Sequence, residues 1–171
     1  MLKKIARFFF SIILAFVIVF GCFWVFFGDT VKEEYAAYKK SSAPILLYHA
    51  VGEPVEIEWP PGMILPASLF EEHLQYLTQE GYQIVTVAEL AERLKFGYSV
   101  EKFVAMSFDD GYRNNHSDAL PLLKKYNAKA SFYIVDRDIG KTIYMNQSHA
   151  LDLHTSDMEI GSHTITHGPL A

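Results

Sequence analysis

The stretch "FVAMSFDDGY", residues 103–112, contains an apolar run that leads directly into two neighbouring carboxylates, Asp109 and Asp110, and a glycine. A continuous apolar run of this length is typical of a strand that is buried on both faces of a parallel sheet. Two adjacent charges at the end of such a strand must be paired, solvated or bound to a cation. Because Asp-Gly is also common in turns, the stretch alone is compatible with either a surface turn or a functional site.

Segments with the patterns of strands and helices alternate on both sides of this stretch. Ser68 with Glu71, and Thr86 with Glu89, stand at capping-box spacing before apolar residues that recur with helical periodicity. The alternation predicts an α/β fold with a mainly parallel sheet. The expected strands are residues 43–51, 82–87, 102–108, 129–135 and 158–162, and the expected helices are 68–80, 87–96, 117–126 and 148–156.

The first expected strand, "APILLYHAV", residues 43–51, is apolar almost throughout. This composition predicts a buried parallel strand rather than a half-exposed one. Residues 52–66, which follow it, are rich in proline and glycine and predict a loop.

Side chains that can bind a metal follow two of the expected strands. Asp109 and Asp110 end the strand at 102–108, and "GSHTITHG" places His163 and His167 four residues apart after the strand at 158–162. Function gathers at the carboxyl ends of strands in parallel sheets. One carboxylate and two imidazoles there make a three-ligand site with positions left for water and substrate, as in catalytic zinc sites. The second carboxylate can then accept a proton from the water.

The composition excludes several other classes of protein. Residues 1–27 hold three of the 15 basic residues and none of the 20 acidic ones, so the remainder carries 12 basic and 20 acidic residues and a formal net charge of −8. Such a surface repels the phosphates of nucleic acids. The single cysteine, Cys22, lies in the apolar N-terminal segment, so a metal bound after that segment must be held by His, Asp or Glu.

The N-terminal segment has the features of a membrane anchor. Residues 8–27 carry no charge and, at ~1.5 Å per residue, are long enough to cross a ~30 Å hydrocarbon layer as one helix. Lys3, Lys4 and Arg7 precede them, which predicts that the tail at 1–7 is cytoplasmic and that everything after the span is outside. Residues 28–42 would then be a polar stalk, and residues 43–171 an extracellular domain.

Two alternatives to a retained anchor exist. A cleavable signal peptide would have a shorter apolar core and a small-x-small cleavage site, neither of which is evident. A lipoprotein acylated at Cys22 would have a small residue in place of Phe20, and five more apolar residues follow the cysteine. The sequence therefore favours a retained signal anchor.

The motifs "SFDDG" and "SHTITH", together with the intervening "ALPLLKKYNAKASFYIV", resemble the polysaccharide deacetylases with a NodB-like catalytic domain, carbohydrate esterase family 4. The resemblance covers residues 43–171 and implies a distorted (β/α) barrel of the NodB type. It also implies metal-dependent hydrolysis of N-acetyl groups from polymers of N-acetylglucosamine in the cell wall or outside the cell. The "LLYHAV" opening is most similar to the subgroup that includes the poly-β-1,6-N-acetylglucosamine deacetylases.

The resemblance implies a role for each matching residue. Asp109 corresponds to the general base, and Asp110, His163 and His167 correspond to the ligands of a divalent metal, with zinc as the default. Tyr112 corresponds to a backbone N–H donor to the oxyanion. His49, which follows the first expected strand, is a candidate for contacting the substrate in the cleft.

The family's later motifs, an Arg-containing motif, an Asp/Trp motif and a Leu-x-His motif that supplies the general acid, do not occur in the 171 residues. The resemblance therefore implies an incomplete barrel, the N-terminal part of an enzyme. The alternative function is a catalytically inactive, membrane-tethered fragment that binds polysaccharide or a partner protein.

Overall fold

The computed structural model describes residues 21, 27–53 and 62–169. Contacts divide the chain into two units, Met1–Lys40 and Ser41–Ala171. Residues 27–41 are helical. The expected cytoplasmic tail at 1–7 and the expected span at 8–27, apart from Gly21 and Phe27, lie outside the described residues. Among the residues that are described, no helix combines the length and the apolar character needed to cross a membrane.

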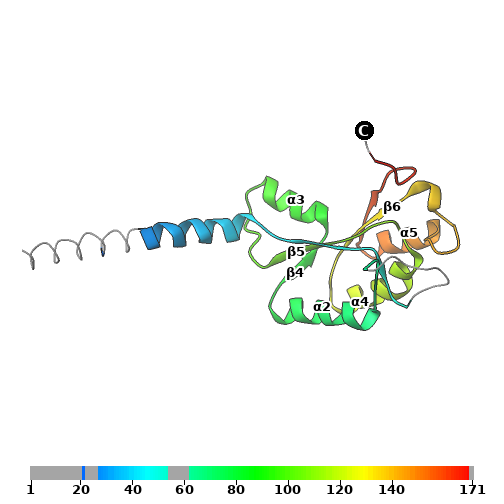
Figure 1. Cartoon of the computed structure of the whole chain (residues 1–171), viewed down its shortest axis with the longest axis horizontal. Helices are drawn as coiled ribbons and strands as arrows, with labels where there is room; N and C mark the ends of the chain where they lie inside the picture. Colours follow the sequence, from blue (N-terminus) through cyan, green and yellow to red (C-terminus); the bar gives the residue numbers. More distant parts are fainter. Residues whose placement is uncertain (1–20, 22–26, 54–61, 170–171) are drawn as a thin grey trace, which may run out of the picture. The chain divides into compact units, whose positions relative to one another are not determined.

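The second unit has the expected α/β architecture (Figure 1), and every strand pairing within it is parallel. Its strands are β1 (Ile45–Tyr48), β2 (Ala50–Val51), β3 (Ile64–Leu65), β4 (Gln83–Val85), β5 (Phe103–Phe108), β6 (Ser131–Ile134) and β7 (Glu159–Ser162). Its helices are α2 (Ala67–Gln79), α3 (Val87–Lys95), the π-helix η1 (Asn115–Ala119), α4 (Leu120–Lys125), the 3-10 turn η2 (Asp136–Asp138) and α5 (Gln147–Thr155). All nine expected elements are present, with boundaries shifted by a few residues.

Strand β5, the strand of the opening stretch, is the centre of the sheet. The strand order is β1-β5-β6-β7, and β4 pairs with the first half of β5. Tyr48 lies beside Phe108, so β1 and β5 end at the same level, while β6 continues two residues past Phe132, the partner of Phe108. In the part of the chain that is described, the path runs from β1 to β7 without closing into a barrel.

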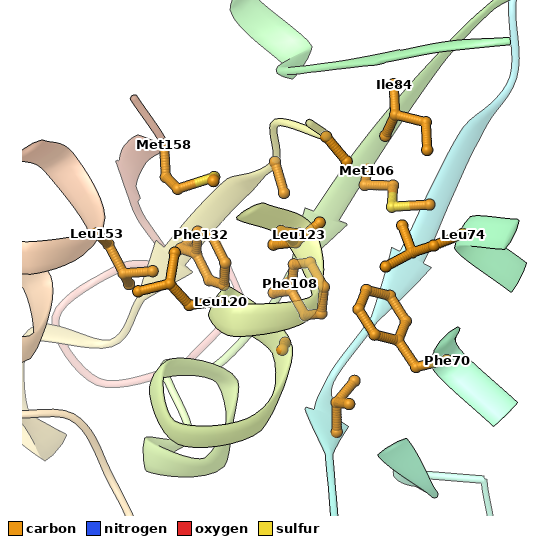
Figure 2. Packing of buried hydrophobic residues seen from close by; sticks show 14 of the residues in the cluster. Phe70, Leu74, Ile84, Met106, Phe108, Leu120, Leu123, Phe132, Leu153 and Met158 are labelled. Atoms are coloured by element: carbon orange, nitrogen blue, oxygen red, sulfur yellow. The ribbon is translucent and has the colours of Figure 1, made fainter. Parts of the chain in front are cut away.

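The core lies on both faces of β5, which explains its unbroken apolar run. Val104, Met106 and Phe108 face a large cluster to which α2 and α4 contribute, while Phe103 and Ala105 face a smaller cluster with α3. Figure 1 shows α2 and α4 on one side of the strands and α3 on the other. In Figure 2, Phe108 lies among Phe132, Leu123 and Phe70 in the larger cluster. The ring of Phe108 stacks on that of Phe132 with 4.7 Å between centroids.

Strand β1 is not buried on both faces, so the prediction for residues 43–51 is wrong at this strand. Leu46 and Tyr48 pack against the larger cluster, but Ile45 and Leu47 are more than half exposed. The strand has only β5 as a neighbour among the described residues, and no helix there covers its second face. The sequence pattern cannot distinguish an apolar side chain that is covered from one that is not.

The helix ends agree with the sequence at α3 and differ at α2. The Thr86 side chain accepts a hydrogen bond from the backbone N–H of Glu89 at 3.1 Å, as its capping position predicts. The expected cap at Ser68 is wrong, because the capping position of α2 is Pro66, two residues earlier, and no side-chain hydrogen bond is made there. Pro66 has an extended backbone and no N–H group, and both properties suit the residue that precedes the first turn of a helix.

Candidate metal centre and catalytic site

The backbone brings the two predicted motifs to the same edge of the sheet. Asp109 and Asp110 follow β5, and His163 follows β7. The N–H of Asp109 donates to the carbonyl of Tyr48 at 3.0 Å, and the N–H of His163 donates to the carbonyl of Ile134 at 2.9 Å. Each motif is therefore tied to the carboxyl end of the neighbouring strand, where parallel sheets place their functional groups.

The backbone of the site adopts left-handed conformations at several positions. Asp110, Thr164 and His167 have φ values of 69°, 68° and 57°. Gly111 has a φ of 79°, and a Cβ atom there would lie 2.9 Å from Cγ2 of Ile134. A non-glycine residue with positive φ costs on the order of 1 kcal/mol, and such strain is concentrated at functional sites. The glycine of "DDG" is therefore needed for the turn that presents both aspartates.

Asp110, His163 and His167 form a compact set of ligand atoms. Oδ1 of Asp110 lies 3.4 Å from Nε2 of His163 and 3.3 Å from Nε2 of His167. The ligand atoms that the three side chains offer all lie within 4.8 Å of one another. One carboxylate and two imidazoles at this separation can bind a single divalent cation.

The burial of Asp110 supports a cation at this position. The residue is only 4% exposed, and its Oδ1 atom is buried without a hydrogen-bond partner. An unpaired buried carboxylate oxygen costs about 1–3 kcal/mol or more. The two imidazoles are partly exposed, so the side of the site away from Asp110 is open to solvent. The donor set, its spacing and the unpaired oxygen all fit a divalent metal, and two imidazoles with one carboxylate suit zinc.

Asp109 lies beside these ligands. Its Oδ2 atom is 3.9 Å from Nε2 of His163, and its side chain is 19% exposed. Burial raises the pKa of the Asp109 carboxyl above its ordinary value, while the nearby imidazoles of His163, His49 and His167 oppose that shift. A more basic carboxylate next to the ligand set is suited to accepting a proton.

Tyr112 is also part of this region. It is 8% exposed, forms an antiparallel bridge with Tyr144, and stacks on the ring of Tyr144 with 5.2 Å between centroids. Burial, the charge of Asp110 and hydrogen bonds to Asp110 and Tyr144 raise the pKa of the Tyr112 hydroxyl. The side chain therefore contacts the buried carboxylate, a contact that the sequence does not predict.

His49 lies between β1 and β2 and is partly buried. Its backbone carbonyl accepts a hydrogen bond from Nδ2 of Asn115 at 2.7 Å, and its imidazole is close enough to Asp109 to lower the pKa of that carboxyl. The structure thus brings together all six residues that the sequence singles out, Asp109, Asp110, Tyr112, His163, His167 and His49. Sequence analysis missed Asn115 and Tyr144, since neither belongs to a recognisable motif.

Comparisons with known proteins agree with this geometry. Residues 97–171 match the sequence model of the family described as Polysaccharide deacetylase. YxkH of Bacillus subtilis (strain 168), which is named as a proposed polysaccharide deacetylase, is 33% identical over 130 residues, covering 75% of this chain and 44% of that protein. The poly-β-1,6-N-acetyl-D-glucosamine N-deacetylase of Escherichia coli (strain K12) is 32% identical over 65 residues, covering 37% of this chain and 10% of that protein.

The fold is similar to that of solved deacetylases. The Streptococcus pyogenes deacetylase PplD, solved in complex with acetate, matches with a TM-score of 0.66 and 26% identity over 74% of this chain and 57% of that chain. The chain spans less than half of the length of YxkH and a smaller share of the Escherichia coli protein.

Proposed function

Because residues 97–171 match the polysaccharide deacetylase family, we propose that this chain hydrolyses N-acetyl groups of an N-acetylglucosamine polymer in the cell wall or outside the cell. The observation that carries the proposal is the buried, unpaired Oδ1 atom of Asp110 between two imidazoles, with a second carboxylate beside it. Two of the similar proteins support the proposal. The Escherichia coli protein is named as a poly-β-1,6-N-acetylglucosamine N-deacetylase, and the Streptococcus pyogenes deacetylase was solved with acetate, the product of such a reaction.

The residues of the chain have separate roles in the proposed reaction. Asp110, His163 and His167 would hold the cation, and zinc is the metal that we propose. When bound, a divalent cation supplies Lewis-acid polarisation of a carbonyl oxygen and increases the acidity of water. Asp109 accepts a proton from the attacking water as the water oxygen forms a bond to the acetyl carbon. The proton must then pass to the amine nitrogen as the C–N bond breaks, so that acetate and the free amine are the products. The backbone N–H of Tyr112 would donate to the oxygen that becomes negatively charged in the transition state.

The proposed roles can be tested by acetate release from oligomers of N-acetylglucosamine. Asp109→Asn removes the proton acceptor but keeps all three ligands, so we expect zinc binding to persist while the rate of acetate release falls by ~10²–10⁴-fold. His167→Ala removes a ligand, so zinc binding and acetate release should fall together. Zinc-loaded wild-type chain that binds the oligomer without releasing acetate would instead identify a polysaccharide-binding protein.

We also propose that residues 8–27 anchor the chain in the cell membrane, with residues 1–7 in the cytoplasm and the catalytic unit outside. The uncharged run at 8–27 and the basic residues that precede it support this proposal. The chain should remain in the membrane pellet after an alkaline carbonate wash, and protease added to intact protoplasts should digest residues 43–171. Recovery of an undigested chain from washed supernatant would contradict the anchor.

A further inference from the structure

We propose that Asn115 is a positioning residue, whose side-chain amide holds His49 beside Asp109 so that the imidazole can contact the N-acetylated sugar. The inference rests on the proposed function for the identity of the substrate. The position of His49 itself can be tested without any reaction.

The sheet register places His49 and Asp109 together. Strands β1 and β5 are parallel and their pairing ends at Tyr48 and Phe108, so the next residue on each strand, His49 and Asp109, leaves the sheet at the same level. Side chains alternate along a strand, and Tyr48 and Phe108 both point into the larger core cluster. His49 and Asp109 therefore start from the opposite face.

Two hydrogen bonds hold the peptide units around His49. The N–H of Asp109 donates to the carbonyl of Tyr48, and Nδ2 of Asn115 donates to the carbonyl of His49 itself. The Tyr48 side chain is held as well, because its ring stacks on Phe108 with 5.3 Å between centroids. The loop that carries His49 is thus attached at two points, to the backbone of Asp109 and to the side chain of Asn115.

The hydrogen bond to the carbonyl of His49 is the one that the structure gives for the Asn115 side chain. The residue is fully buried, and its Oδ1 atom has no hydrogen-bond partner in the structure. A buried amide that leaves its oxygen unpaired is unfavourable for folding, and the 2.7 Å bond to the carbonyl of His49 offsets only part of that cost. An apolar side chain of the same size would serve the core better, so the amide is best explained by the loop that it holds.

The helix that contains Asn115 also contacts the far end of the His49 loop. Asn115 begins η1, a π-helical segment, and such segments are frequent at functional sites. Gly52, after β2, has a φ of 132°, and a Cβ atom there would lie 2.8 Å from Oδ2 of Asp118 in the same π-helix. The loop is therefore hydrogen-bonded to η1 before β2 and closely approaches it after β2, so a change in η1 would displace His49 relative to Asp109.

A double-mutant cycle tests whether Asn115 acts through His49. The variants are Asn115→Ala, His49→Ala and the combination, with zinc-loaded chain and a β-1,6-linked pentamer of N-acetylglucosamine as the probe. Asn115→Ala should lower kcat/KM for acetate release by roughly tenfold, about the effect of one lost hydrogen bond, and leave zinc affinity unchanged. The same change should have no further effect in the His49→Ala background. Losses that multiply, or a loss of zinc affinity, would overturn the proposal.

A matched control separates positioning from a general effect of truncating a buried amide. Asn114→Ala removes the neighbouring buried amide, whose Nδ2 and Oδ1 atoms have no hydrogen-bond partner, and should leave kcat/KM nearly unchanged. Asn115→Asp keeps the size of the side chain but replaces the donor with an oxygen, so it should reproduce the loss caused by Asn115→Ala. This second variant also applies if the alanine variant fails to fold.

Histidine imidazole NMR signals give a readout that is independent of the reaction. In zinc-loaded chain, the His49 signals should shift or broaden in Asn115→Asp and stay unchanged in Asn114→Ala. Wild-type chain that releases no acetate would remove the proposed function, and the NMR comparison would still decide the role of Asn115. Unchanged His49 signals in both Asn115 variants would overturn it whatever the reaction.

Discussion

Replacing Asp110 with asparagine should have opposite effects on the stability of the metal-free and the zinc-loaded protein. In the absence of metal, Oδ1 of Asp110 is a buried carboxylate oxygen without a hydrogen-bond partner. A neutral amide at this position avoids part of the cost of burying the carboxylate charge. We therefore expect Asp110→Asn to stabilise the metal-free chain by about 1 kcal/mol.

The zinc-loaded protein should respond in the other direction. Zinc at 1,000 times its dissociation constant stabilises a folded protein by about 4.1 kcal/mol. For a domain of this size, ~4 °C of Tm per kcal/mol converts that to a rise of about 16 °C. Loss of the anionic ligand should weaken binding by at least ~100-fold, since even substitutions outside the ligand set cost about 10–100-fold. At the same zinc concentration, the gain in Tm should then be about 6 °C or less.

The assay is thermal unfolding with zinc and with EDTA, followed by circular dichroism. Asp157→Asn is the matched control, because Asp157 is exposed and has a φ of 63°, close to the 69° of Asp110. Asparagine tolerates the left-handed region, so the control reports any effect of the substitution on the backbone. A full zinc-dependent rise in Tm in Asp110→Asn, or a greater loss of stability in EDTA than the control shows, would contradict a metal-binding role for Asp110.

Three further predictions follow from individual contacts. Tyr112→Phe removes the hydroxyl that hydrogen bonds to the buried carboxylate and should weaken zinc binding by about tenfold in a titration, whereas equal affinity would contradict the contact. Gly161→Ala would place a Cβ atom against the ring of Tyr133 and should cost about 1–3 kcal/mol in urea unfolding; an unchanged midpoint would show that the ring moves freely. Burial lowers the pKa of His149, whose Nδ1 accepts from the N–H of Asn146, so the wild type should lose stability as the pH falls below the ordinary histidine pKa of 6.5. His149→Gln should reduce this dependence of stability on pH, and an equal slope in both proteins would contradict the prediction.

Much of the fold could be predicted because its elements have strong local patterns. Strand β5 is apolar at five of six positions since core packs on both of its faces, and Thr86 caps α3 as its spacing to Glu89 predicts. Helix α5 has a capping box that its sequence does not reveal, because His149 takes the place usually held by glutamate or glutamine and its Nδ1 accepts from the N–H of Asn146.

The candidate site could be predicted where its residues belong to short motifs at strand ends. Asp109, Asp110, His163 and His167 were found this way, and the parallel register places them together. Asn115 could not be found, because its partner is a backbone carbonyl 66 residues earlier in the chain. Backbone carbonyls carry no sequence signature, so such a contact is visible only in three dimensions.

Metal-dependent acetate release is the most direct test of the proposed function. The chain should be stripped with EDTA, reloaded with one equivalent of zinc, and incubated with β-1,6-linked oligomers of N-acetylglucosamine while acetate is measured. We expect no release from the stripped chain, release after zinc is restored, and none from zinc-treated Asp110→Asn. Equal release with and without zinc, or no release from wild-type chain that has bound zinc and oligomer, would contradict it.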